Sequence, residues 1–455
     1  LKAPNLKGVS MEILFLLLSV LCIIWLTTRL KVHPFLALLL ISMGYGALAG
    51  MPLESLVDAV NDGFGDTLGK IGLIIVLGII IGAFLEHTGG ARAIADKVLT
   101  WIGSKRVPLA MGVLGYIVSI PVFADSGFML LDPLGKSLSR KSKTSLAGSA
   151  IALGLGLMVS HTLVPPTPGP IAAAGILGAD LGLVILFGLP VSLLALAVSV
   201  VFATRYAAKT WIDPVATPEA TLEPIESEVA HRPGFLVSSL PILVPILLIV
   251  LKSVLGGGGN GISPVLATWV GFLGEPVIAL MIGLLFCLLL PAKLDRQMLS
   301  STGWVGQAVR DAASILLITG AGGIFGTVLQ RSGIAESLGS LLVAYDLGIF
   351  LPFVLAAALK TAQGSSTVAL ITAASILLPM MPSLGLETEI QKALAVVALG
   401  AGSSVISHAN DSFFWVVTQM SGMDVRTGYR LFGGGTFLLG TPAALGVFIC
   451  SLLFA

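Results

Sequence analysis

A short polar segment, VSHTLVPPTPGP at residues 159–170, lies between two long apolar segments of the chain. Its four prolines cannot continue a helix, because each lacks an N–H group and restricts the residue before it. Irregular backbone at membrane depth is tolerated only where protein or a water-filled cavity satisfies its polar groups. A polar, helix-breaking segment between membrane helices therefore predicts a binding site.

The composition supports a membrane location for these helices. Hydrophobic residues make up 56% of the 455 residues and charged residues only 11%, and the mean hydropathy is +1.01. Soluble domains carry about 25% charged residues, so we expect a lipid bilayer around this chain. A net charge of +1 argues against a nucleic-acid partner. The three cysteines lie far apart in apolar segments, which predicts packing rather than a metal site or a disulfide framework.

Apolar runs of about 20 residues can span a bilayer. Such runs fall near 11–29, 33–50, 71–87, 107–122, 145–163, 181–204, 235–254, 264–290, 312–329, 348–361, 366–381, 391–407 and 430–454. Several are short or interrupted by Gly and Pro, so hydropathy predicts about 11 to 14 segments. Residues 1–10 are interpreted as an expression remnant or a short N-terminal arm and do not enter the fold argument.

The longest polar stretch, residues 205–233, divides the chain into a first half, 11–204, and a second half, 234–455. It begins with Arg205 and Lys209, and basic loops mark the cytoplasmic side of membrane proteins. We therefore predict a cytoplasmic linker here. The same rule places an acidic loop containing Asp58, Asp62 and Asp66 on the outside.

The two halves resemble each other. When residues 79–99 are compared with 322–342 at an offset of about 244 positions, Gly82 meets Gly326 and Gly89 meets Gly333. With small gaps, FADSGF falls near AQGSST and His161 falls near His408. The loop charges predict that the repeats, about 71–180 and about 312–423, are inverted relative to each other. Inverted repeats with discontinuous helices are typical of secondary transporters.

Four polar clusters interrupt the hydrophobic background. Backbone N–H groups at the start of a half-helix favour an anion, and short polar side chains can bond hydroxyl groups. A lone Ser or Thr more often bonds the preceding helical turn, but several together at each break favour a site. The predicted substrate-binding residues are Asp125, Ser126, Gly127, His161, Thr162, Thr167, Gln363, Gly364, Ser365, Ser366, Thr367, His408, Asn410, Asp411 and Ser412.

Two histidines and two aspartates are candidates for carrying a proton: Asp125, His161, His408 and Asp411. Histidine exchanges protons near neutral pH, and an aspartate between apolar flanks must be paired, protonated or hydrated. For each histidine the alternative is a neutral ring that bonds to backbone and fixes a hairpin. Lys360 either pairs with a substrate carboxylate or extends to the membrane interface.

No enzyme signature stands out. GAGGIFG (320–326) resembles a dinucleotide-binding loop, but it lies in an apolar segment without a βαβ unit. A Walker A motif is absent from the sequence, so ATP is not the predicted energy source. We expect no catalytic residues, no metal and no cofactor, with transport driven by the proton gradient.

At these clusters the sequence resembles the gluconate permease family of bacterial proton symporters. The resemblance runs from about Met11 to the C-terminus. Its most specific parts are HTLVPPTPGPIAAAGILGADLG (161–182), FADSGF (123–128), ALKTAQGSSTVALITAASI (358–376) and SHANDSFFWVVTQMSGM (407–423). It implies import of gluconate or a related sugar acid across the bacterial inner membrane, although some members carry D-serine, glycerate or fructuronate.

The resemblance further implies membership of the ion-transporter superfamily, which includes dicarboxylate and citrate carriers. It implies a homodimer with a scaffold domain, an elevator-type transport domain and two re-entrant hairpins. By this analogy the hairpin tips fall at Asp125–Gly127 and Gln363–Thr367, and the interrupted helices at His161–Pro170 and His408–Ser412. Sodium-coupled relatives carry a Ser-Asn-Thr motif where this chain has GSST, which favours coupling to protons.

We therefore predict an all-α polytopic membrane protein that imports a small hydroxylated carboxylate, gluconate first, together with protons. The substrate carboxylate is expected against Gly364–Thr367 and Thr162–Thr167, and its hydroxyls near Asp125, Asn410 and Asp411. One alternative is a symporter of the same family for D-serine, glycerate or another small hydroxy acid. A more distant alternative is a channel or an intramembrane enzyme.

Overall fold

The computed structural model describes all residues except 1–10, 104–105, 215–232, 257–262, 335–347 and 455. The predicted N-terminal arm and most of the predicted linker therefore lie outside the described residues. The described part of the chain is helical and contains no strand, which confirms the all-α prediction. Its first half contains α1 (Met11–Thr28), α2 (Pro34–Leu48), α3 (Leu53–His87), α4 (Gly90–Ile102), α5 (Val107–Val118), α6 (Ala124–Ser142), α7 (Leu146–Leu163), α8 (Pro168–Leu177), α9 (Leu181–Arg205) and the short η2 (Ala207–Lys209).

The second half repeats much of this order. It contains α10 (Phe235–Gly256), α11 (Pro264–Leu273), α12 (Pro276–Cys287), η3 (Arg296–Leu299), α13 (Trp304–Arg331), α15 (Phe350–Gln363), α16 (Ser366–Leu377), η4 (Leu378–Met380), η5 (Pro382–Leu384), α17 (Glu389–Ser403), α18 (Ser412–Met420), α19 (Val425–Gly428), the π-helical η6 (Tyr429–Gly433) and α20 (Gly434–Phe454). A long helix (α3, α13) is followed by a helical hairpin (α5–α6, α15–α16) and then by a broken helix (α7–α8, α17–α18). This order of long helix, hairpin and broken helix occurs in each described half.

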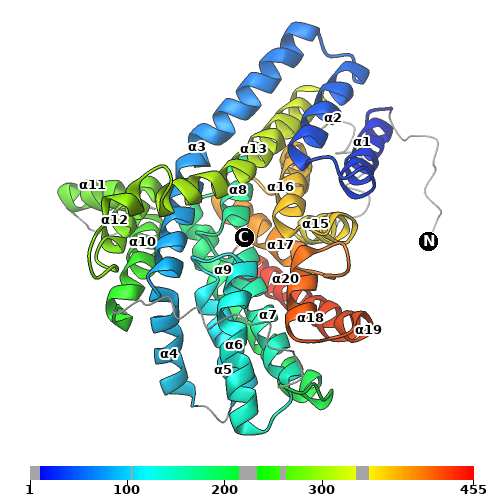
Figure 1. Ribbon diagram of the computed structural model, residues 1–455. Helices are drawn as coiled ribbons and strands as arrows, with labels where there is room; N and C mark the ends of the chain where they lie inside the picture. The colour runs from blue at the N-terminus through cyan, green and yellow to red at the C-terminus, as the bar shows by residue number, and fades with distance from the viewer. Residues whose placement is uncertain (1–10, 104–105, 215–232, 257–262, 335–347, 455) are drawn as a thin grey trace.

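Six described helical stretches are long and apolar enough to cross a membrane, and a seventh is added if α11 and α12 form one bent span. The predicted single run at 264–290 is thus two helices, which meet at 67°. The predicted 11 to 14 segments also included runs that form shorter apolar helices, among them α2, α5 and α15. In Figure 1, α10, α11 and α12 lie on one side of the molecule and α1 lies on the other.

The predicted acidic loop is wrong, because these residues are helical. α3 begins at Leu53 and includes Asp58, Asp62 and Asp66, which are all exposed. Their spacing of four residues places them on one face of the helix, whereas Leu56, Ala59, Gly63 and Thr67 are buried. A helix of 35 residues is about 52 Å long, longer than the bilayer core of about 30 Å. The acidic N-terminal half can therefore extend beyond the hydrocarbon as a helix.

α3 packs closely along α13 (Figure 1). A Cβ atom at Gly63 would lie 2.7 Å from the carbonyl oxygen of Gly323, so only glycine allows this approach. Small residues at helix contacts are typical of membrane bundles. The Arg331 guanidinium also binds the Asp62 carboxylate at 2.7 Å. The two long helices, one from each half, thus pack together as one unit.

The first hairpin turns earlier than predicted. α5 ends at Val118 and α6 begins at Ala124, so the tip comprises residues 119–123 and contains Pro121. The tip lies against α3, because a Cβ at Gly82 would be 2.0 Å from the Pro121 carbonyl oxygen. The predicted tip residues Asp125–Gly127 form the first turn of α6 instead. A proline lacks the N–H group that would continue α5, which explains the earlier break.

Candidate functional site

Four helix N-termini, those of α6, α8, α16 and α18, lie at the breaks in the two halves. α8 approaches α16, since a Cβ at Gly169 would lie 3.9 Å from the Cα of Thr367. α6 approaches α18, where the rings of Phe128 and Phe413 meet edge to face at 6.2 Å. Asp125, in the first turn of α6, interacts electrostatically with Asp411, the residue that precedes α18. The breaks of both halves therefore gather in one interior region.

Local sequence explains why each helix begins where it does. α8 begins at Pro168, whose missing N–H costs nothing in the first turn of a helix. α16 begins after Ser365, whose side-chain oxygen accepts a hydrogen bond from the Val368 N–H at 3.3 Å. α18 begins after Asp411, whose Oδ1 accepts from the Phe413 N–H at 3.0 Å. Such N-caps satisfy backbone donors that would otherwise lack partners.

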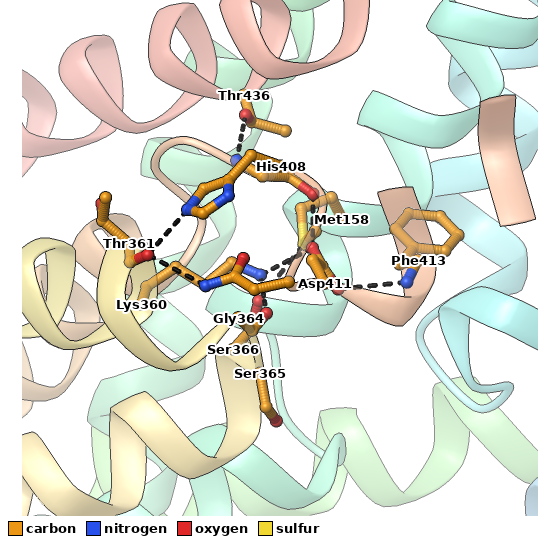
Figure 2. Close-up of polar contacts among 12 residues, drawn as sticks. Met158, Lys360, Thr361, Gly364, Ser365, Ser366, His408, Asp411, Phe413 and Thr436 are labelled. Carbon is orange, nitrogen blue, oxygen red and sulfur yellow. Dashed lines mark hydrogen bonds and ion pairs between the residues drawn. The ribbon is translucent and has the colours of Figure 1, made fainter. Parts of the chain in front are cut away.

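An ion pair between Lys360 and Asp411 lies at the centre of this region (Figure 2). Lys360 Nζ is 2.6 Å from Asp411 Oδ2, and the two side chains are 0% and 6% exposed. Lys360 Nζ also donates to the carbonyl oxygen of Gly364, and the Ser407 hydroxyl donates to Asp411 Oδ2. The α15–α16 hairpin is thereby joined to the break between α17 and α18. The pair is fully engaged, so Lys360 does not extend to the membrane interface.

Two predicted site residues, His408 and Asn410, bind backbone carbonyl groups at the end of α15. His408 Nε2 lies 2.7 Å from the Thr361 carbonyl oxygen and therefore carries the hydrogen in this contact. Asn410 Nδ2 donates to the carbonyl oxygens of both Thr361 and Ala362 at 3.0 Å. The last carbonyls of a helix lack partners within it. His408 thus makes the backbone contact that fixes a hairpin, as one of its two interpretations predicts.

Gly364 allows the break loop to approach the hairpin tip. Its φ is +88°, a region that side chains strongly disfavour. A Cβ at this position would lie 2.1 Å from the Asn410 carbonyl oxygen. Only glycine fits, and the hairpin tip therefore rests directly on the 404–411 break.

His161 and Asp125 are in a different situation. His161 Nδ1 and Asp125 Oδ1 are buried and have no hydrogen-bond partner among the described residues. His161 lines a narrow cavity with Phe123, Pro166 and Pro168, and it interacts electrostatically with Asp411 and Lys360. Buried polar atoms in native proteins nearly always have partners. The two unpaired atoms are therefore available to a substrate or a proton.

The two histidines do not occupy equivalent elements. His161 lies in the last turn of α7, before the first break, whereas His408 lies inside the longer second break. The sequence match between them reflects a shared Ser-His pair rather than a shared position in the two broken helices.

The hydroxyl groups of several predicted site residues already have hydrogen-bond partners within the protein. Thr162 donates to Met158 O at 2.9 Å and Thr167 donates to Val164 O at 2.8 Å. The Ser366 hydroxyl donates to the sulfur of Met158 at 3.7 Å. Gln363, by contrast, has both side-chain amide atoms buried without a described partner. The remaining predicted residues, Ser126, Gly127, Thr367 and Ser412, lie in the first turns of α6, α16 and α18.

Two contributors were not predicted from the sequence. Ser407 bonds Asp411 with its hydroxyl, and its backbone N–H donates to Thr436 Oγ1 at 2.9 Å, which ties the break to α20. Ser407 stands four residues before Asp411 in SHAND, a spacing that could have indicated the contact. Met158 supplies the sulfur next to Ser366, and no pattern in the sequence marks it.

Comparisons with known proteins give one consistent result. A family model described as "GntP family permease" matches residues 11–453. A gluconate permease of Pseudomonas aeruginosa is 35% identical, over 96% of this chain and 97% of its own. A D-serine transporter of Escherichia coli is 32% identical (96% and 98%), and an inner membrane permease of the same species is 32% identical (93% and 95%). A solved structure of the YdaH transporter of Alcanivorax borkumensis shares the fold, with a TM-score of 0.64 and 16% identity over 96% of this chain and 99% of its own.

Proposed function

Because the chain belongs to the GntP family of permeases, we propose that it imports gluconate or a related small sugar acid by proton symport. The family and the relatives establish the coarser part of this statement: the protein is a multi-pass membrane permease and not an enzyme. The predicted family resemblance is thereby confirmed. Relatives named inner membrane permease and gluconate permease support the bacterial inner membrane as its location and a sugar acid as its substrate.

The observation that carries the proposal is the buried Lys360–Asp411 pair next to converging helix N-termini. Helix N-termini favour an anion, because the helix dipole is positive there and the first N–H groups have no acceptor within the helix. We expect the substrate carboxylate to bind against Gly364–Thr367 and the start of α8. We expect its hydroxyls to lie near Asp125 and Gln363. The Thr162 and Thr167 hydroxyls already donate to backbone, so they can serve only as acceptors for the substrate.

Among the four proton-coupling candidates, the contacts favour His161 and Asp125. Both hold a buried atom without a described partner. Asp411 is ion-paired with Lys360, and His408 is bound to a backbone carbonyl. A proton taken up by the His161–Asp125 region would change the charge next to the Lys360–Asp411 pair, which gives a physical link between proton and substrate.

We further propose that the two halves are inverted repeats and that the protein works as a homodimer by an elevator-type movement. The matching order of elements supports the repeat, and hairpins with interrupted helices are typical of secondary transporters. The moving domain would contain both hairpins and both broken helices, and the remaining helices would form the scaffold.

D-serine is a second candidate substrate, because a D-serine transporter is 32% identical over nearly the whole chain. Its ammonium group would need an acidic partner. Asp125 has an unpaired carboxylate oxygen in the same region and could supply one.

Uptake of labelled gluconate into proteoliposomes, with an imposed pH gradient, tests the proposal. We expect accumulation that collapses with a protonophore and is blocked by unlabelled sugar acids. If D-serine or glycerate competes and gluconate does not, the substrate assignment is wrong. Accumulation that requires sodium and ignores the pH gradient would refute proton coupling.

A further inference from the structure

A second cavity, of about 300 Å³, lies between the α1–α2 connection and the tip of the α15–α16 hairpin. The connection contributes Lys31 and His33, and the hairpin contributes Gln363 and Ser365. None of the described residues that line this cavity is acidic. Small-molecule sites begin at about this volume and usually combine apolar walls with a few polar groups.

Lys31 is held in an unfavourable backbone conformation. Its φ is +53°, in the left-handed region that L-residues other than glycine, asparagine and aspartate rarely adopt. The neighbouring N–H groups of Leu30 and Val32 donate back to α1, to Trp25 O and Leu26 O. Glycine is the residue favoured for such a turn after a helix. A lysine at this position costs backbone energy that a glycine would not.

The Lys31 ammonium is the available cation of the cavity. Its side chain is exposed, and no described carboxylate lies within ion-pair distance of it. His33 is already engaged: its Nδ1 accepts from the Phe35 N–H at 3.3 Å and its Nε2 lies 3.1 Å from Ser314 Oγ on α13. A ring nitrogen that accepts a hydrogen bond is unprotonated, so His33 is neutral in these contacts. It anchors the connection, and Lys31 supplies the charge.

The hairpin side of the cavity offers groups that bind hydroxyls. Gln363 lines the cavity, and its two amide atoms are buried without a described partner, so they reach a ligand only when the side chain turns toward the cavity. The Ser365 oxygen accepts from the Val368 N–H, so its own O–H remains free to donate. A cation facing an amide and a hydroxyl matches a molecule with one carboxylate and several hydroxyl groups.

We propose that this cavity is an entry site that captures hydroxylated carboxylates, with Lys31 binding the carboxylate and Gln363 and Ser365 binding the hydroxyls. The inference deepens the proposed function and rests on it. The cavity adjoins the hairpin tip, because Ser365 is the residue that caps α16, so a captured anion is next to the N-terminus of that helix. Lys31 thus raises substrate affinity without taking part in coupling.

Gluconate uptake by Lys31→Gly and Lys31→Gln in proteoliposomes tests the proposal. A lost charge-assisted contact is expected to raise the KM about tenfold, with kcat within about twofold of the unchanged protein. Lys31→Gly should melt at the same or a higher temperature, because glycine adopts a positive φ without strain. Arg29→Gln removes an exposed charge two residues away, outside the cavity, and should leave the KM unchanged. Equal KM values for all three variants and the unchanged protein would overturn the proposal. An equal rise of the KM in Lys31→Gln and in Arg29→Gln would also overturn it.

A second measurement needs no substrate. Val32→Cys places a thiol in the cavity, in a background where Cys22 and Cys450 are serine and Cys287 is buried. The measured quantity is the rate of thiol modification by a negatively charged methanethiosulfonate divided by the rate with a neutral one. This ratio should fall about threefold or more in Lys31→Gln. An unchanged ratio would refute an anion-attracting cavity. Failure of the unchanged protein to take up gluconate would instead refute the proposed substrate, while the labelling ratio still decides the nature of the cavity.

Discussion

Lys360 and Asp411, 51 positions apart in the sequence, form an ion pair of 2.6 Å in which the lysine is completely buried. The pair joins the hairpin of the second half to the break before α18. Removing either partner leaves an uncompensated charge in a low-dielectric interior, which is far more costly than losing a surface pair. The two residues therefore contribute to stability as one unit.

Asp411→Asn should lower the free energy of unfolding by about 3–5 kcal/mol. The double variant Lys360→Gln/Asp411→Asn should lose less than the sum of the single losses, by about 1–3 kcal/mol, because no unpaired charge remains. The measurement is a double-mutant cycle in detergent micelles. Glu389→Gln, which removes the exposed partner of Lys392, is the control and should change stability by less than about 1 kcal/mol. Additive losses at Lys360 and Asp411 would contradict a coupled pair.

Asp411→Asn should also abolish uphill uptake of gluconate in proteoliposomes with an imposed pH gradient. The reason is that the ammonium of Lys360, no longer neutralised, would attract the substrate carboxylate and hold it. Folded protein is first verified by gel filtration, and Glu389→Gln again serves as the control. Near-normal concentrative uptake by Asp411→Asn would exclude a role for this carboxylate in coupling.

Gly364→Ala should impair transport and stability more than Gly385→Ala. Both glycines have positive φ values, of +88° and +66°, so both variants are strained by about 1–2 kcal/mol. Only at position 364 would the new Cβ meet a neighbour, the Asn410 carbonyl oxygen at 2.1 Å, whereas nothing lies within 4 Å at position 385. Melting temperatures and initial uptake rates measure the difference. Equal effects would show that the contact between hairpin tip and break is unimportant.

Substitution of His161 and substitution of His408 should have different effects on stability and transport. His408→Ala removes a hydrogen bond to the end of α15 and should lower the free energy of unfolding by about 1 kcal/mol. The response of uptake to the pH gradient should remain unchanged. His161→Ala removes a ring nitrogen without a described partner, so no hydrogen bond to the described residues is lost there, and we expect a loss of pH-driven accumulation. Uptake measured with and without the gradient distinguishes the two outcomes. The reverse pattern would assign the proton to His408.

The prolines of residues 159–170 illustrate a feature that sequence reasoning could find. They prevent α7 from continuing, and the structure ends α7 at Leu163 and begins α8 at Pro168. The breaks at Gly364 and at SHAND were also located from local residue types. The acidic residues at 58, 62 and 66 show the opposite case, because low hydropathy suggested a loop although their spacing of four fits a helical face.

The sequence by itself determined that the chain is helical, membrane-embedded and broken at defined polar segments, because propensity, hydropathy and missing N–H groups act within a few neighbouring residues. It also contained the candidate residues of the site. Only the tertiary structure decided that Lys360 pairs with Asp411 and that His408 bonds to backbone, whereas His161 Nδ1 has no partner among the described residues. It also decided that Lys31 and Gln363 line the same cavity. Those outcomes depend on the packing of segments far apart in the chain, which no local pattern specifies.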